Sequence, residues 1–305
     1  MVAPVAIPEQ PIARASRAGS RFWRAPMLQS LPLRFSVLII CFLWTLPTAG
    51  LLVSSVRNPQ LITRTGWWEG LLHLFDKDQW TLQNYQQVLA ANGMGDAFLN
   101  SLIVTIPSTV IPITIAAFAA YAFAWIPFRG RGILFTIVVA LLVVPLQMAL
   151  IPVLKLYSGL SLYGTFIGVW LAHSAFGLPL AIFLLYNFMS QLPRDLFESA
   201  SIDGASAFQT FTRIVLPLSI PALGAFAIFQ FLWVWNDLLV ALVFLGPGTG
   251  VRVMPTALFN LLGAYGGAWH LLTAGAFLTM VVPLAVFLLL QRAFVRGILA
   301  GSVKS

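Results

Sequence analysis

The sequence predicts an all-α integral membrane protein with six transmembrane helices. Of its 305 residues, 59% are hydrophobic and only 9% are charged, whereas charged residues make up about a quarter of an average soluble domain. The charges are also grouped, so that none lies between Arg213 and Asp237 or between Arg252 and Arg292. Uncharged runs of about 20 apolar residues match the roughly 30 Å hydrocarbon core of a bilayer.

These uncharged runs place the six helices in order along the chain. Among the prolines inside the runs are Pro107, Pro112, Pro145 and Pro283. Because proline removes a helical N–H group, we expect kinks there, with neighbouring helices or polar side chains satisfying the freed carbonyl groups. The expected spans are 35–56, 98–126, 132–155, 165–190, 217–245 and 270–291.

The first span is expected to stay as a membrane anchor. Roughly 34 residues precede it, its apolar run is long for a signal peptide, and no small-x-small cleavage pattern follows closely. We therefore expect a disordered cytoplasmic segment over residues 1–34 and a six-helix transmembrane domain over residues 35–305.

The distribution of Lys and Arg predicts the orientation. Cytoplasmic loops carry an excess of these residues, and twelve of the 17 lie in segments that are inside when both termini are inside. The net charge of +8 then reflects this asymmetry, and no basic cluster with interleaved aromatic residues indicates nucleic-acid binding. The five on the outer side are Arg57, Arg64, Lys77, Lys155 and Arg252.

Two outer loops are long, 57–97 and 246–268, and the second is rich in glycine. Within the first, apolar residues recur at helical spacing and predict a short amphipathic helix. It either lies at the outer interface with its tryptophans at headgroup level, or forms a cap packed on the spans. The residues concerned are Trp67, Trp68, Leu71, Leu72 and Phe75.

The inner loop 191–216 predicts two short helices around a glycine. Asp195 and Glu198 have the spacing of a capping box and follow Pro193, which predicts a helix start. Gly204 is placed to end that helix.

Ser206 and Gln209 form a second capping box, which predicts the start of the next helix. Ala200 and Gly204 are four residues apart, and their small side chains let another backbone approach. A docking site for a partner protein and a well-capped connection between two spans both fit these residues. The expected apolar side of the second helix comprises Phe208, Phe211 and Ile214.

Several enzyme motifs are absent from the sequence. There is no G-x-x-x-x-G-K-[ST] phosphate loop, so any ATP must be hydrolysed by another chain. There is no H-E-x-x-H, the three histidines are scattered, and Cys41 is the single cysteine, which excludes an intrachain disulfide. We therefore expect no catalytic residue, no bound cofactor and no metal site.

The residues of the inner loop resemble the coupling loop of inner-membrane permeases of ATP-binding-cassette (ABC) importers. Ser199 stands where that family usually has Ala. Further similarity runs through roughly residues 35–305 and is strongest to the second permease subunit of maltose-type carbohydrate importers, with α-glucoside systems nearest. The matching residues are Glu198-Ser199-Ala200, Gly204, Ile214, Leu216-Pro217, Thr81–Tyr85, Asn100-Ser101-Leu102, Tyr121-Ala122, Phe128–Arg131, Trp235-Asn236-Asp237 and the tail Gln291–Gly297.

This resemblance implies the ABC importer permease fold in a bacterial or archaeal inner membrane. It implies a heterodimer with a second permease subunit, an ABC ATPase dimer that receives the coupling loop and the C-terminal tail, and an external solute-binding protein near loop 246–268. The cargo is then a sugar. The residues that it assigns to ATPase coupling are Glu198, Ala200, Asp203, Gly204, Ile214, Leu216 and Pro217.

A sugar path needs amide partners and flat apolar ring faces. Gln230, Trp233 and Asp237 share one helix face by their spacing. Hydrogen bonding between helices and interfacial anchoring are the alternative roles. The candidate path residues are Gln147, Asn187, Gln230, Trp233, Trp235, Asn236 and Asp237.

An ion-coupled secondary transporter or channel is the alternative function. Such proteins place ionisable groups within their spans as relays. Here Asp237 and His173 are the clear candidates. We expect Asp237 near the outer end of its helix, facing a cavity or a polar or backbone partner, and His173 as a neutral residue bonded to a neighbouring helix.

Overall fold

The computed structural model describes residues 31–91, 93–246, 250–264 and 268–302. The chain divides into two compact units, residues 1–49 and 50–305. The described part is helical, with one isolated β-bridge between Arg57 and Trp80. In chain order the elements are α1 (Leu31–Ser55), α2 (Pro59–Ile62), α3 (Trp67–Leu72), η1 (Lys77–Gln79), α4 (Gln83–Gln86), η2 (Gln87–Ala91), α5 (Met94–Trp125), α6 (Arg131–Ala140), η3 (Leu141–Val143), α7 (Leu146–Gly159), α8 (Phe166–Met189), α9 (Arg194–Ile202), α10 (Ala207–Thr210), η4 (Phe211–Val215), α11 (Leu216–Asn236), α12 (Leu239–Phe244), α13 (Met254–Ala264) and α14 (Trp269–Ser302).

Five helical stretches among the described residues are long and apolar enough to cross a bilayer. They are α1, α5, α8, the stretch Ala207–Asn236 that ends in α11, and α14 as far as Leu289. The α6–η3 segment and α7 make a sixth when counted as one broken span. The all-α membrane fold predicted from the sequence is confirmed. Most of the segment expected to be disordered, residues 1–34, lies outside the described residues; its last four open α1.

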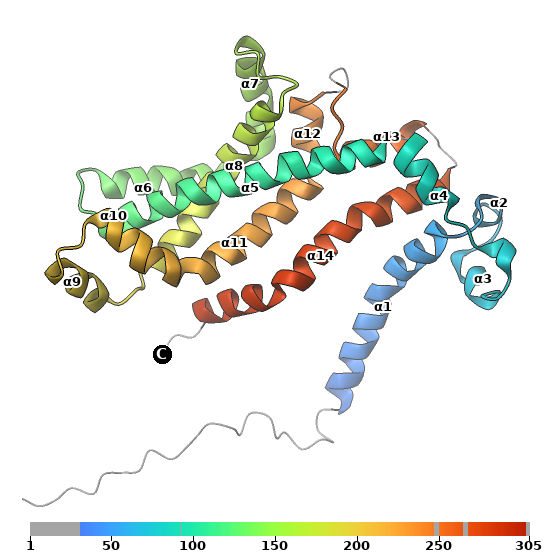
Figure 1. The fold of residues 1–305 in the computed structure, drawn as a ribbon, viewed down its shortest axis with the longest axis horizontal. Helices are drawn as coiled ribbons and strands as arrows, with labels where there is room; N and C mark the ends of the chain where they lie inside the picture. The colour runs from blue at the N-terminus through green and yellow to red at the C-terminus, as the bar shows by residue number, and fades with distance from the viewer. Residues whose placement is uncertain (1–30, 92, 247–249, 265–267, 303–305) are drawn as a thin grey trace, which may run out of the picture. The chain divides into compact units, whose positions relative to one another are not determined.

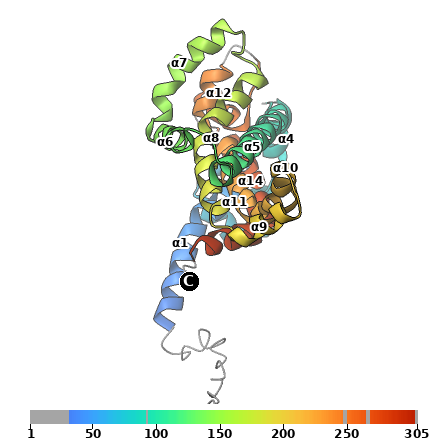
Figure 2. The same cartoon turned by 90° about the vertical axis from the view of Figure 1, so that its left-hand side faces the viewer.

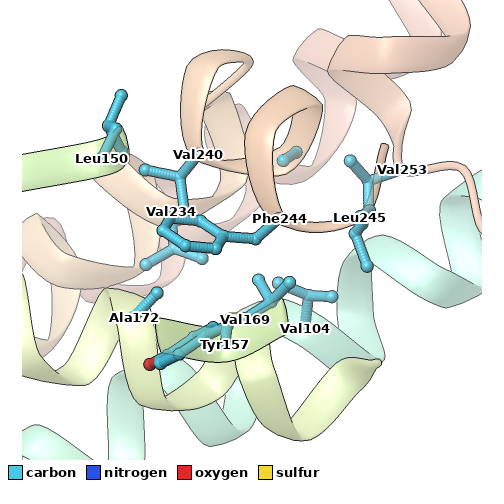
Figure 3. Close-up of a cluster of buried hydrophobic side chains, with 11 residues drawn as sticks. Val104, Leu150, Tyr157, Val169, Ala172, Val234, Val240, Phe244, Leu245 and Val253 are labelled. Carbon is cyan, nitrogen blue, oxygen red and sulfur yellow. The ribbon is translucent and has the colours of Figure 1, made fainter. Parts of the chain in front are cut away.

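Within the second unit, α5 packs along α8 and α11, and α11 also packs against α14. The α9–α10 segment lies at one end of this bundle, and α2, α3, α4 and α13 lie at the other (Figure 1). A buried apolar cluster joins α5, α7, α8, α11 and α12, with Phe244 in its middle (Figure 3) and the ring of Tyr157 5.2 Å from that of Phe244. The predicted loops 57–97 and 246–268 are therefore partly helical, since they hold α2 to α4 and α13.

The third predicted span, 132–155, is wrong as a single helix. The chain bends by 103° between the α6–η3 segment and α7, and α7 leaves the line of α6 in both views (Figures 1 and 2). Pro145 is the N-cap of α7, and Val144 before it is extended, with ψ 117°. A residue that precedes proline is driven out of the helical region, so the kink expected at Pro145 is a sharp break.

The fifth predicted span, 217–245, is also interrupted. Helix α11 ends at Asn236, and Asp237 has an extended conformation with ψ 110°. Its carboxylate accepts a hydrogen bond of 2.9 Å from the N–H group of Val240 in α12. An aspartate that binds nearby backbone N–H groups competes with helix continuation, which explains the break.

The other prolines within the spans sit in continuous helices, and three of the carbonyl groups that they free are satisfied from neighbouring helices. A proline leaves the carbonyl four residues earlier without its helical donor. For Pro107, Pro112 and Pro283, a side-chain N–H group of another helix donates to the carbonyl oxygen that the proline frees, as the sequence predicts. We call these the proline–donor pairs: Trp170 to Ile103 (2.9 Å, Pro107), Gln230 to Ser108 (3.2 Å, Pro112) and Trp235 to Thr279 (3.0 Å, Pro283).

A buried arginine organises the segment between α1 and α4, which sequence reasoning missed. The Arg57 side chain is fully buried and donates to Thr65 Oγ1, the Gly66 carbonyl and Gln79 Oε1. Burial lowers the pKa of this guanidinium below its ordinary value. The predicted amphipathic helix is present as α3, but it ends at Leu72, before Phe75.

Candidate functional site

We define the elbow as residues 193–217, which run from α9 through α10 and η4 to the start of α11. Helix α9 begins one residue after Pro193, which is its N-cap and provides no side-chain hydrogen bond. The predicted capping box of Asp195 and Glu198 is therefore wrong. Asp195 sits inside the first turn instead, where a negative charge still suits the helix dipole.

The turn of the elbow depends on Gly204, whose φ is +71°. The N–H groups of Gly204 and Ala205 donate to the carbonyls of Ser201 (3.1 Å) and Ala200 (2.9 Å), which is the hydrogen-bond pattern of a Schellman C-cap. A Cβ atom built on Gly204 would meet nothing within 4 Å. Glycine is therefore required here by its backbone conformation, and the surface above it is open.

The second capping box is confirmed. Ser206 Oγ accepts from the N–H group of Gln209 at 3.2 Å, and Gln209 Oε1 accepts from the N–H group of Ser206 at 2.8 Å. These paired bonds fix the start of α10, which passes through the π-helical turn η4 into α11.

Aromatic side chains of α5 attach the elbow to the bundle, a feature that sequence reasoning missed. Trp125 stacks on Phe197 of α9 with ring centroids 3.5 Å apart. The Tyr121 hydroxyl donates to the Ala207 carbonyl at 3.1 Å, and its ring packs against Phe211. Regular aromatic positions near the end of a span are the only sequence signal for these contacts. Both arms of the elbow are thus fastened to the same end of α5.

The elbow presents a mixed surface at its tip, which we define as Ile202, Asp203, Gly204 and Phe208. All four are exposed, with 86% of Ile202 and 65% of Phe208 accessible. Of the predicted apolar side of this helix, Phe211 is buried, Ile214 is half-buried and Phe208 is exposed.

The remaining coupling candidates differ in their access to a partner. Glu198 and Pro217 are exposed, Ile214 and Leu216 are half-buried, and Ala200 is 5% exposed. Ala200 therefore packs inside the elbow, where its carbonyl receives the Schellman bond. The side chains of the tail Gln291–Gly297 lie outside the described residues.

A cavity of about 550 Å³ lies at the break between α6 and α7, where α8 and α11 complete its wall. We call it the break cavity. Its lining includes Pro145, Phe176, Gly177, Phe229, Gln230 and Trp233. Of the predicted path residues, Gln230 and Trp233 therefore come together.

The other path candidates do not line the break cavity. Gln147 is exposed at the start of α7, and Asn187 is half-buried in α8. The Asn236 amide donates to the Leu232 carbonyl within its own helix. The Asp237 carboxylate accepts from the Val240 N–H group, so its partner is a backbone group as expected. Trp235 is buried in a proline–donor pair.

A model of the family described as binding-protein-dependent transport system inner membrane component matches residues 112–300. The chain is 55% identical to the osmoprotective compounds uptake permease protein GgtD of Synechocystis sp., covering 96% of this chain and 99% of that protein. It is 45% identical to the alpha-glucoside transport system permease protein AglG of Rhizobium meliloti, covering 92% and 98%. A chain of a bacterial alginate ABC transporter, crystallised with an alginate pentasaccharide-bound periplasmic protein, shares the fold with a TM-score of 0.60 at 18% identity, covering 86% and 93%.

Proposed function

Because the chain belongs to the family of binding-protein-dependent transport system inner membrane components, we propose that it is a permease subunit of an ATP-driven sugar importer. It is a multi-pass inner-membrane protein that contributes half of the transmembrane path, and a different permease subunit contributes the other half. The sugar is an oligosaccharide or α-glucoside delivered by a solute-binding protein. The identity to AglG over nearly the whole chain supports this substrate class.

The exposed elbow is the observation that carries the proposal. A connection that only joined two spans would not need to expose Ile202 and Phe208 beside a rigid glycine turn. We assign the tip and Glu198 to contact with a separate ATPase dimer, since the sequence has no phosphate loop. Ala200 supports the elbow from within, and Ile214, Leu216 and Pro217 join it to α11.

The proposed transmission runs from the elbow to the break cavity. Trp125 and Tyr121 hold the two arms of the elbow on α5, and η4 continues into α11. A displacement of the tip therefore acts on both helices, and α11 carries Gln230 and Trp233. Gln147, Asn187, Asn236 and Asp237 stay predictions as further path residues.

The proposal includes an orientation in which both termini and the elbow are cytoplasmic. Cys41 is replaced by Ala, and single cysteines are placed at the most exposed positions of the two ends, Phe75 and Ile202. In intact cells an impermeant maleimide should label Phe75→Cys but not Ile202→Cys; labelling of Ile202→Cys from outside would contradict the orientation.

The function itself is tested by reconstitution. This chain, a second permease subunit and an ATPase dimer in proteoliposomes should import sugar only when ATP and the solute-binding protein are supplied. The purified chain alone should neither bind nor hydrolyse ATP. Uptake should persist when a protonophore collapses the proton gradient. Transport by this chain alone, driven by an imposed ion gradient, would establish a secondary transporter instead.

A further inference from the structure

The amide of Gln230 has only one possible orientation. Its nitrogen lies 3.2 Å from the Ser108 carbonyl oxygen and 3.4 Å from the His173 carbonyl oxygen. Both neighbours are acceptors, so the amide must present its NH₂ group to them. Ser108 is the residue whose carbonyl loses its helical donor to Pro112, which makes this bond necessary to α5 as well as to α11. The amide is therefore held by two helices, and its oxygen faces away from both carbonyls.

That oxygen, Gln230 Oε1, has no hydrogen-bond partner among the described residues. The residue is 0% exposed, and a buried polar atom without a partner is unfavourable. Gly177 lies directly against it, because a Cβ atom built on Gly177 would stand 2.6 Å from the oxygen. Gln230 and Gly177 both line the break cavity. The protein thus keeps a fixed, unpaired acceptor on a residue that borders the cavity, with Gly177 packed against the oxygen.

The lining of the break cavity indicates what kind of group can use this acceptor. Among the lining residues none is charged, and Trp233, Phe176 and Phe229 supply aromatic rings. A cavity of about 550 Å³ is within the usual range for small-molecule sites, which combine apolar walls with a few placed polar groups. The ligand that fits is neutral, carries a hydroxyl donor and has an apolar ring face.

We propose that the break cavity is a sugar subsite on this subunit, and that Gln230 Oε1 accepts a hydrogen bond from one hydroxyl group of the transported sugar. This inference rests on the proposed function, since it requires that a sugar pass through the protein. Gln230 is then a specificity-determining residue, Trp233 provides a ring face, and Gly177, which has no side chain, lets the Gln230 amide pack at this position.

The same amide links the subsite to the helices that the elbow moves. Its nitrogen holds the Ser108 carbonyl of α5 while its oxygen holds the sugar. A shift of α5 relative to α11 therefore changes the position of the acceptor, and sugar binding in turn favours the arrangement in which the amide is fully paired.

The test measures discrimination between a sugar and analogues that lack one hydroxyl. The complete transporter is reconstituted, and trehalose, sucrose and maltose are used as probes. The sugar transported best is then compared with its monodeoxy analogues by kcat/KM. A site built to bond a hydroxyl rejects the analogue without it, here by about tenfold or more. With Gln230→Met, rejection of one analogue should fall by about tenfold relative to the wild type. Because the same solute-binding protein is used with the wild type and with Gln230→Met, a difference in discrimination between them arises in the permease.

Trp170→Phe is the matched control. It also removes a side-chain N–H group from a proline-freed carbonyl of α5, but Trp170 does not line the break cavity. It should keep the wild-type discrimination. If Gln230→Met does not accumulate in the membrane, Gly177→Ala is used in its place. Its new methyl group crowds Oε1 and should also reduce the discrimination between the sugar and its analogue.

Occupancy is tested directly with Ala175→Cys in a Cys41→Ala background, since Ala175 lines the break cavity. Saturating sugar should slow alkylation of this cysteine. The inference is overturned if ATP-dependent uptake is normal but Gln230→Met and Gly177→Ala discriminate like the wild type. It is equally overturned if sugar leaves the alkylation rate unchanged, as expected when the partner permease fills the cavity. Absence of ATP-dependent uptake in the wild type would instead defeat the proposed function.

Discussion

The elbow and the packed centre of α5, α8 and α11 satisfy their polar groups in opposite ways. In the elbow, most hydrogen bonds join residues a few positions apart, as between Ser206 and Gln209, and the bond from Tyr121 to Ala207 is an exception. In the centre, the proline–donor pairs join residues far apart in the chain, as between Gln230 and Ser108. The elbow therefore has a shape that its own sequence imposes, whereas the centre is completed only when the bundle assembles.

This difference separates two kinds of failure. A substitution in the elbow should change how the protein engages the ATPase while leaving the bundle intact. A substitution in a proline–donor pair should leave a buried carbonyl unpaired and lower the stability of the bundle itself. Measurements of uptake and of thermal unfolding on the same variants therefore test whether the two regions are independent.

The largest effect is expected for Gly204→Ile. A β-branched residue at a φ of +71° is strained by about 1–2 kcal/mol or more, and the new side chain occupies the open surface of the tip. Uptake should fall by about tenfold or more, with weaker ATPase association and an unchanged amount of protein in the membrane. Gly204→Asn tolerates this conformation and should retain most of the activity. Wild-type uptake by Gly204→Ile would show that the elbow only connects two spans and does not transmit ATPase motion.

A smaller effect, on stability, is expected for Trp235→Phe. The indole is 1% exposed and donates to the Thr279 carbonyl that Pro283 frees. Its loss should destabilise the protein by about 1–3 kcal/mol, seen as a lower midpoint of thermal unfolding. Trp170→Phe should cost a similar amount, because the Ile103 carbonyl lies in a membrane span, where lipid offers no replacement hydrogen bond. A much smaller cost for Trp170→Phe would mean that water reaches the Ile103 carbonyl.

The smallest effect is expected within the elbow itself. Ser206→Ala removes the capping box and should cost about 1 kcal/mol of local stability, visible as faster amide exchange over residues 207–210. Ser199→Ala is the matched control, since Ser199 is exposed and only back-bonds to the Asp195 carbonyl; it should stay within about 0.5 kcal/mol. A loss as large from Ser199→Ala would contradict the assignment of the Ser206→Ala effect to the capping box.

Much of the fold could be predicted because membranes demand long apolar helices, and short-range capping rules describe the elbow. The errors arose where two local signals competed. Pro145 signals a kink, but a break of 103° depends on what α7 packs against. Asp237 sits in an apolar run of helical length, yet its carboxylate found a backbone partner in Val240 that ends α11. Likewise, Pro193 took the cap position that Asp195 was expected to fill.

By itself, the sequence determined the membrane class, the uninterrupted spans, the glycine turn at Gly204 and the capping box of Ser206 and Gln209, because each depends on residues close together in the chain. Only the tertiary structure decided which carbonyl each donor reaches, since Gln230 and Ser108 are 122 positions apart. It also decided that the oxygen of Gln230 is left unpaired beside a cavity. The physical reason is that a side-chain amide in an apolar helix needs a partner, but only packing determines which of the available groups comes within hydrogen-bond distance.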